Sequence, residues 1–85
     1  MKQFSEFSKE DQRLICEAMR INNDTMLNAL DGKIVDNSDE FEACINNMSK
    51  DAKLFLIEIL KGSLPEEYIE YKGGLKQWHF SKFHM

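Results

Sequence analysis

The chain has 85 residues, of which 42% are hydrophobic and 31% are charged, and its formal net charge is −4. This length fits one small domain, and the balance of apolar and charged residues excludes a wholly disordered chain. The longest purely apolar run, Leu54–Ile57, is far below the roughly 20 residues that a membrane-spanning helix needs, and this excludes such a helix.

The N-terminal part predicts two helices separated by a polar break. Ser8 precedes acidic residues and an apolar run at helical spacing, which predicts a helix over residues 9–20 with Ser8 as its N-cap. The polar cluster at residues 22–24 favours a turn, because short polar side chains hydrogen-bond to the nearby backbone. A second short helix would then cover Asn23 to Leu30 and end at Asp31-Gly32.

A short extended connector over residues 33–36 leads to two further helices. Ser38 predicts the N-cap of the first of these helices, which covers Asp39–Asn47. The second covers residues 50–61, ends at Gly62 and is apolar nearly all round. A helix of this kind is contacted on several sides or lies in an oligomer seam, so we expect it to be the most buried element.

Beyond residue 64 the sequence leaves two alternatives open. Pro65 followed by acidic residues favours a short helix over residues 65–71. Gly73-Gly74 favours instead a β-hairpin over residues 68–80. In either case we expect the aromatic-rich residues 64–85 to pack on the helical part. The expected fold is an all-α single domain over residues 1–85, a compact bundle of four to five short helices with or without this hairpin.

Residues 12–31 carry the spacing of a helix-turn-helix. Apolar or small residues stand where two short helices would cross, at Ile15, Cys16, Met19, Ile21, Met26 and Ala29. The stretch resembles the helix-turn-helix of bacterial and phage repressors, although Arg20 stands at the turn position that is usually glycine. The resemblance implies a DNA-binding transcriptional regulator. An asparagine amide can hydrogen-bond to adenine. In this interpretation the candidate base-contacting residues of the chain are therefore Asn22, Asn23 and Asn28.

The whole net charge of the chain is located in residues 31–48, where Lys33 alone accompanies five acidic residues. A field of this sign repels phosphate and therefore disfavours a nucleic-acid partner. It would instead steer a protein partner with a basic surface, through the candidate acids Asp36, Asp39, Glu40 and Glu42. The alternative is a solvated helix face whose acidic residues suit the helix dipole.

Aromatic side chains near the C-terminus are candidate anchors for such a partner, because they bury large rigid areas. The candidate anchors are Tyr68, Tyr71, Trp78 and Phe83. The alternative is that these aromatic side chains complete the core.

In size and charge the chain resembles phage-borne inhibitors, antitoxins and bacteriocin immunity proteins. This resemblance implies a small non-catalytic protein that occludes its partner. A homodimer, or a larger complex that covers Leu54 and Ile57, is a further alternative.

The sequence favours neither catalysis nor metal binding. Cys16 and Cys44 lie on apolar stripes, where burial keeps thiols inert. With His79 and His84 they provide no close pair of ligands that could nucleate a zinc site. We therefore expect no enzyme, no metal and no cofactor. Small secreted domains usually carry several disulfides, and a secretory signal needs an N-terminal apolar stretch. This chain has two cysteines and lacks such a stretch, which favours reduced thiols and a cytoplasmic location.

Overall fold

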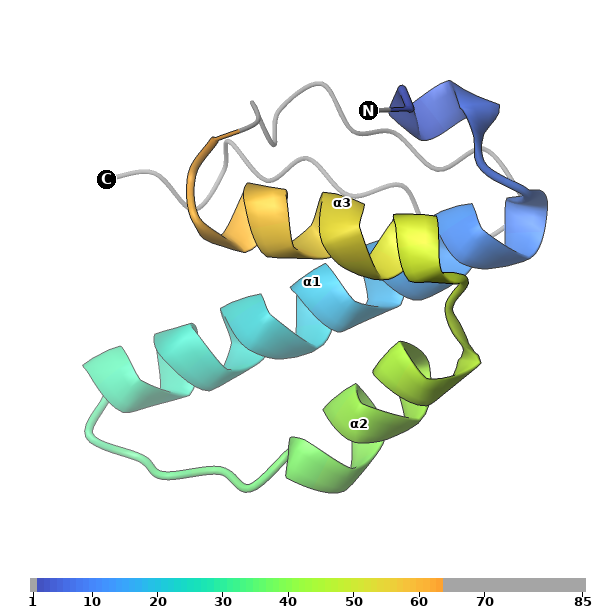
Figure 1. Ribbon diagram of the computed structural model, residues 1–85. Coiled ribbons are helices and arrows are strands. Elements are labelled where there is room, and N and C mark those ends of the chain that lie inside the picture. Colours follow the sequence, from blue (N-terminus) through green and yellow to red (C-terminus); the bar gives the residue numbers. More distant parts are fainter. Residues whose placement is uncertain (1, 64–85) are drawn as a thin grey trace.

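The computed structural model describes residues 2–63, which form three α-helices and one short 3-10 helix (Figure 1). α1 is the longest helix, and both α2 and α3 contact it. In Figure 1, α2 runs back along α1, and α3 then follows the general direction of α1 again. The predicted all-α class is confirmed for these residues, which contain no strand. The elements are η1 (Phe4–Glu6), α1 (Lys9–Leu30), α2 (Ser38–Asn47) and α3 (Lys50–Leu60).

The break predicted at residues 22–24 is wrong, because α1 continues through them as one helix of 22 residues. The polar side chains of this region bond along the helix and do not turn the chain. The Thr25 hydroxyl donates to the Ile21 carbonyl at 3.0 Å, and the Asn28 amide donates to the Asp24 carbonyl at 2.8 Å. Each bond spans one helical turn. The expected four to five helices are therefore not confirmed, since two of them are one.

Apart from the break inside α1, the predicted N-caps and glycine stops agree with the structure except at the start of α2. The hydroxyls of Ser8 and Ser49 accept hydrogen bonds from the first turns of α1 and α3 at 3.1 and 3.2 Å. Gly32 and Gly62 follow the C-termini of the same two helices with φ angles of 78° and 80°, a left-handed conformation that glycine adopts without strain. Ser38 was predicted to be the N-cap of α2, but α2 begins at Ser38 itself and its N-cap is Asn37.

The core lies mainly between α1 and α3. Its most enclosed large side chains are those of Ile15, Leu56 and Ile59. Phe7 closes the core from the N-terminal side, with its ring 5.2 Å from the ring of Phe55 in an edge-on arrangement. The buried residues are Phe7, Leu14, Ile15, Cys16, Ala18, Met19, Ile21, Cys44, Met48, Ala52, Phe55, Leu56 and Ile59.

Among residues 2–63, α3 is covered on one face, whereas its sequence predicted either contact on several sides or a place in an oligomer seam. Leu54, Ile57 and Leu60 each expose between 44% and 47% of their surface.

The start of α3 is held in place by Asp11 of α1. The two carboxylate oxygens of Asp11 accept hydrogen bonds from the Ser49 backbone N–H at 3.1 Å and from the Ser49 hydroxyl at 2.7 Å. This link between residues distant in sequence fixes where α3 begins against α1.

The substitution Asn23→Pro distinguishes one continuous helix from two helices that meet at residue 23. Inside a helix, proline removes a backbone hydrogen bond and collides with the preceding turn, so we expect the free energy of unfolding to fall by about 3 kcal/mol or more. At the first position of a separate helix, proline would be tolerated. Urea unfolding of Asn23→Pro beside the control Asn23→Ala measures the difference. Equal stability of the two variants would contradict a continuous α1.

Candidate functional site

The four acidic residues predicted to contact a partner lie on one exposed stretch at the start of α2. Asp36 is in the loop after α1, Asp39 and Glu40 are in the first turn of α2, and Glu42 follows them. All four are exposed. Asp39 and Glu40 also lie where the helix dipole favours negative charge. We call residues 36–42 the acidic stretch.

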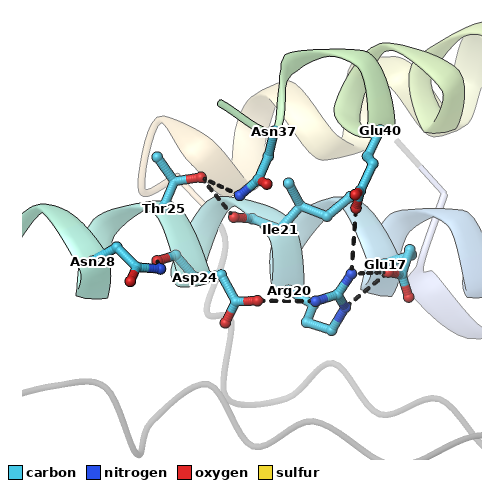
Figure 2. Close-up of polar contacts among 8 residues, drawn as sticks. All are labelled: Glu17, Arg20, Ile21, Asp24, Thr25, Asn28, Asn37 and Glu40. Carbon is cyan, nitrogen blue, oxygen red and sulfur yellow. Dashed lines mark hydrogen bonds and ion pairs between the residues drawn. The ribbon is translucent and has the colours of Figure 1, made fainter. Parts of the chain in front are cut away.

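Arg20 of α1 is the basic residue that lies beside the acidic stretch (Figure 2). Its Nη1 bonds to Asp24 Oδ2 at 3.0 Å, its Nε bonds to Glu17 Oε1 at 2.8 Å, and its Nη2 lies 4.0 Å from Glu40 Oε2. The hydrogen bond that Arg20 donates to Glu17, together with the nearby carboxylates, raises the pKa of Arg20. Arg20 thus connects α1 to α2 while its charge is shared among three carboxylates. The other acids of the stretch form no ion pair within residues 2–63.

A side-chain bond between Thr25 and Asn37 holds the loop against α1 (Figure 2). The Thr25 hydroxyl donates its hydrogen bond to the Ile21 carbonyl, so the Thr25 oxygen can only accept a hydrogen bond from Asn37. Asn37 must therefore offer its amide nitrogen, which lies 3.1 Å from Thr25 Oγ1. The carbonyl oxygen of the Asn37 side chain is left without a donor among the described residues. Sequence reasoning missed this bond, because it expected a turn just before Thr25.

A pocket of about 280 Å³ lies where α1, the loop and the start of α2 meet. Ile21, Val35 and Phe41 give it an apolar wall, while Asp36 and Asn37 contribute polar groups. A small side chain or the end of a longer one fits into a space of this size. Neither Val35 nor Phe41 was singled out from the sequence as part of a site. They meet only because α1 extends far enough to carry the loop.

Asp36 is held in place by its neighbour Ser38. Its Oδ1 accepts the Ser38 backbone N–H at 3.1 Å and the Ser38 hydroxyl at 2.6 Å. These two bonds favour the charged form, and they hold the pKa of Asp36 below that of a free aspartate. Oδ2 takes no hydrogen bond from the described residues. The Asp-x-Ser spacing is typical of an Asx turn, a signal that could have predicted this geometry.

Exposed apolar side chains continue from α1 into the loop. Met26 and Ala29, expected inside a helix-turn-helix, are exposed, and Met26 shows 57% of its surface. The other four residues of that predicted interior are buried against α2 and α3. Within residues 2–63, Ile34 and Leu30 are the most exposed large apolar side chains. The exposed apolar side chains of the last turns of α1 and of the loop are Met26, Leu27, Leu30, Ile34 and Val35. Exposed apolar side chains beside charged groups are a common feature of interaction surfaces.

The three candidate base-contacting asparagines lie in the middle and last turns of α1, not on a separate recognition helix. The Asn28 amide donates to the Asp24 carbonyl, and the Asn22 amide lies 3.8 Å from the Met26 sulfur. The Asn23 amide nitrogen is buried and has no hydrogen-bond partner in the described part of the chain. The two-helix geometry on which the helix-turn-helix prediction depended is therefore not formed by these residues.

Both cysteines are free and buried. Burial raises the pKa of the Cys16 thiol to about 12 and also raises the pKa of Cys44. Thiols in this state are poor nucleophiles at neutral pH. Within residues 2–63 no three histidine, cysteine or acidic side chains gather in a way that could hold a metal ion.

Several predicted features lie outside the described residues. They are the helix over residues 65–71, the hairpin over residues 68–80, the packing of residues 64–85, His79, His84, and the aromatic anchors Tyr68, Tyr71, Trp78 and Phe83. In the part of the chain that the structure covers, no helix is both long and apolar enough to cross a membrane.

Comparison of the sequence with protein-family models, curated proteins and solved structures found no match.

The substitution Ser38→Ala tests the geometry of Asp36. It removes the hydroxyl that contributes most to the lowered pKa, so we expect the pKa of Asp36 to rise towards that of a free aspartate. In the parent protein, the stability contributed by this carboxylate is present above its unfolded pKa and is lost as pH falls through its lower folded pKa. Carboxyl-carbon NMR titration of both proteins measures the shift. An identical pKa in both would show that Ser38 does not hold Asp36.

Proposed function

We propose that this chain is a non-catalytic binding protein that covers a basic surface of a protein partner. One observation carries the proposal: the exposed carboxylates of the acidic stretch lie directly beside exposed apolar side chains of the same loop. Ile34 and Val35 precede Asp36, and α2 then adds three further acids. An apolar centre with a charged rim is the usual composition of a protein interface.

The charges of the acidic stretch are available to a partner. Within residues 2–63, Asp36, Asp39 and Glu42 form no ion pair, while Glu40 pairs with Arg20. Exposed charges of one sign steer a complementary surface and raise its association rate. The same charges repel nucleic acid, whose phosphates need basic contacts. A basic protein surface is therefore the partner that this part of the molecule favours.

A non-catalytic role is supported by the state of the thiols. The raised pKa values of Cys16 and Cys44 keep both side chains protonated at neutral pH, where only a thiolate attacks efficiently. Occlusion needs none of these groups, since a partner is blocked when its surface is covered. Natural inhibitors of this kind depend on a complementary surface and a few well-packed anchors.

Charge reversal on α2 tests the proposal. A partner is first captured from a cell lysate with the full chain and identified, and its association is then followed at several salt concentrations. In the variant Asp39→Lys/Glu42→Lys, Glu40 keeps its contact with Arg20. We expect association to slow by about tenfold or more and its salt dependence to flatten, because the steering charges are lost.

The matched control is Glu6→Lys/Asp51→Lys, which changes the net charge equally. Glu6 of η1 and Asp51 in the first turn of α3 line the same hollow. Figure 1 shows η1 and the start of α3 away from the start of α2, where the acidic stretch lies. The control is expected to associate nearly as fast as the parent. Equal slowing in both variants would mean that net charge alone matters, and unchanged kinetics in the α2 variant would remove the acidic stretch from the interface.

A further inference from the structure

The pocket beside the acidic stretch combines an apolar wall with one fixed carboxylate. Ile21 of α1, Val35 of the loop and Phe41 of α2 form the wall, in a space of about 280 Å³. Asp36 lies among the lining residues, and two bonds from Ser38 to its Oδ1 hold it in place. A ligand for this pocket therefore has an apolar part and a group that an anionic oxygen attracts.

The side-chain oxygens of the loop residues in the pocket that take no hydrogen bond are acceptors. Asp36 Oδ2 receives no hydrogen bond within residues 2–63, and neither does the side-chain oxygen of Asn37, whose nitrogen donates to Thr25. The Thr25 hydroxyl already donates its hydrogen bond to the Ile21 carbonyl. Two oxygens, one of them charged, therefore remain for a donor. A cationic donor satisfies both the hydrogen bonding and the charge.

We propose that this pocket receives a lysine side chain of the basic partner, with its methylene stem against Val35 and Phe41 and its ammonium at Asp36. The inference rests on the proposed function and names the group that anchors the interface. A lysine matches the pocket because its stem is apolar while its head is a charged donor. Arginine fits less well. Its planar fork binds a carboxylate through both oxygens, and Ser38 already occupies Oδ1 of Asp36.

The test uses the full chain labelled with ¹⁵N and a synthetic peptide in which lysines alternate with glycines. Matched peptides carry norleucine, acetyl-lysine or arginine in place of lysine. We expect the lysine peptide to shift the amide signals of Val35, Ser38 and Phe41 in a saturable way. The norleucine and acetyl-lysine peptides lack the charge and should cause no such shifts. The arginine peptide is expected to bind several-fold more weakly.

Two variants separate the pocket from the general attraction of the acids. Asp36→Asn keeps Oδ1 as an acceptor for Ser38, so the loop retains its bonds, but it removes the charge. We expect it to weaken the lysine peptide about tenfold, as for loss of a charge-assisted hydrogen bond. Asp39→Asn removes an equal charge from a residue that does not line the pocket. Its effect should stay below about twofold, as expected for an exposed charge.

The outcomes distinguish failure of the pocket from failure of the proposed function. Equal weakening by Asp36→Asn and Asp39→Asn, or equal binding of the norleucine peptide, would overturn the lysine pocket. The acidic stretch would then still bind a basic partner. If no cationic peptide binds in a saturable way even at low salt, both the pocket and the basic partner are wrong.

Discussion

The continuity of α1 through residues 22–24 is the constraint on which the rest of the structure depends. A helix of 22 residues is long enough for α2 and α3 to pack on it along different faces. Its last turns extend past the buried core, so their apolar side chains remain exposed and carry the loop. The bond between Thr25 and Asn37 and the contact between Arg20 and Glu40 then fix the loop and α2 against the same helix. A chain that turned at residue 23 could form neither the pocket nor this arrangement.

The acidic stretch follows from that geometry together with an uneven distribution of charge. Nearly all acids of α1 have a basic residue within one helical turn. Glu10 pairs with Arg13, and Glu17 pairs with Arg20. The loop contains one lysine and α2 contains no basic residue, so within residues 2–63 their carboxylates other than Glu40 form no ion pair. Exposed charge of one sign adds little to the stability of a small domain, since surface ion pairs and surface repulsion are both weak. It acts instead on association, where long-range attraction changes rates.

Local sequence signals predicted the helix boundaries that depend on one residue and its immediate neighbours. Ser8 and Ser49 as N-caps and Gly32 and Gly62 as stops each act through the nearest backbone groups, and the apolar spacing of residues 14–21 identified the core face. The error arose where propensity competes with longer contacts. Asparagine and aspartate favour turns only weakly, and side-chain bonds along α1 with packing against α2 outweigh that preference. The pocket could not be predicted, because it joins three segments whose relative placement depends on this continuity.

Multidimensional NMR of the labelled full chain tests the continuity of α1 most directly. A continuous α1 gives helical ¹³Cα shifts without interruption from Lys9 to Leu30, and a close approach between the Thr25 methyl protons and the side-chain amide of Asn37. Both results together would establish that one helix carries the loop and α2. A loss of helical shifts at residues 22–24, with no contact between Thr25 and Asn37, would contradict a continuous α1 and restore the two-helix arrangement.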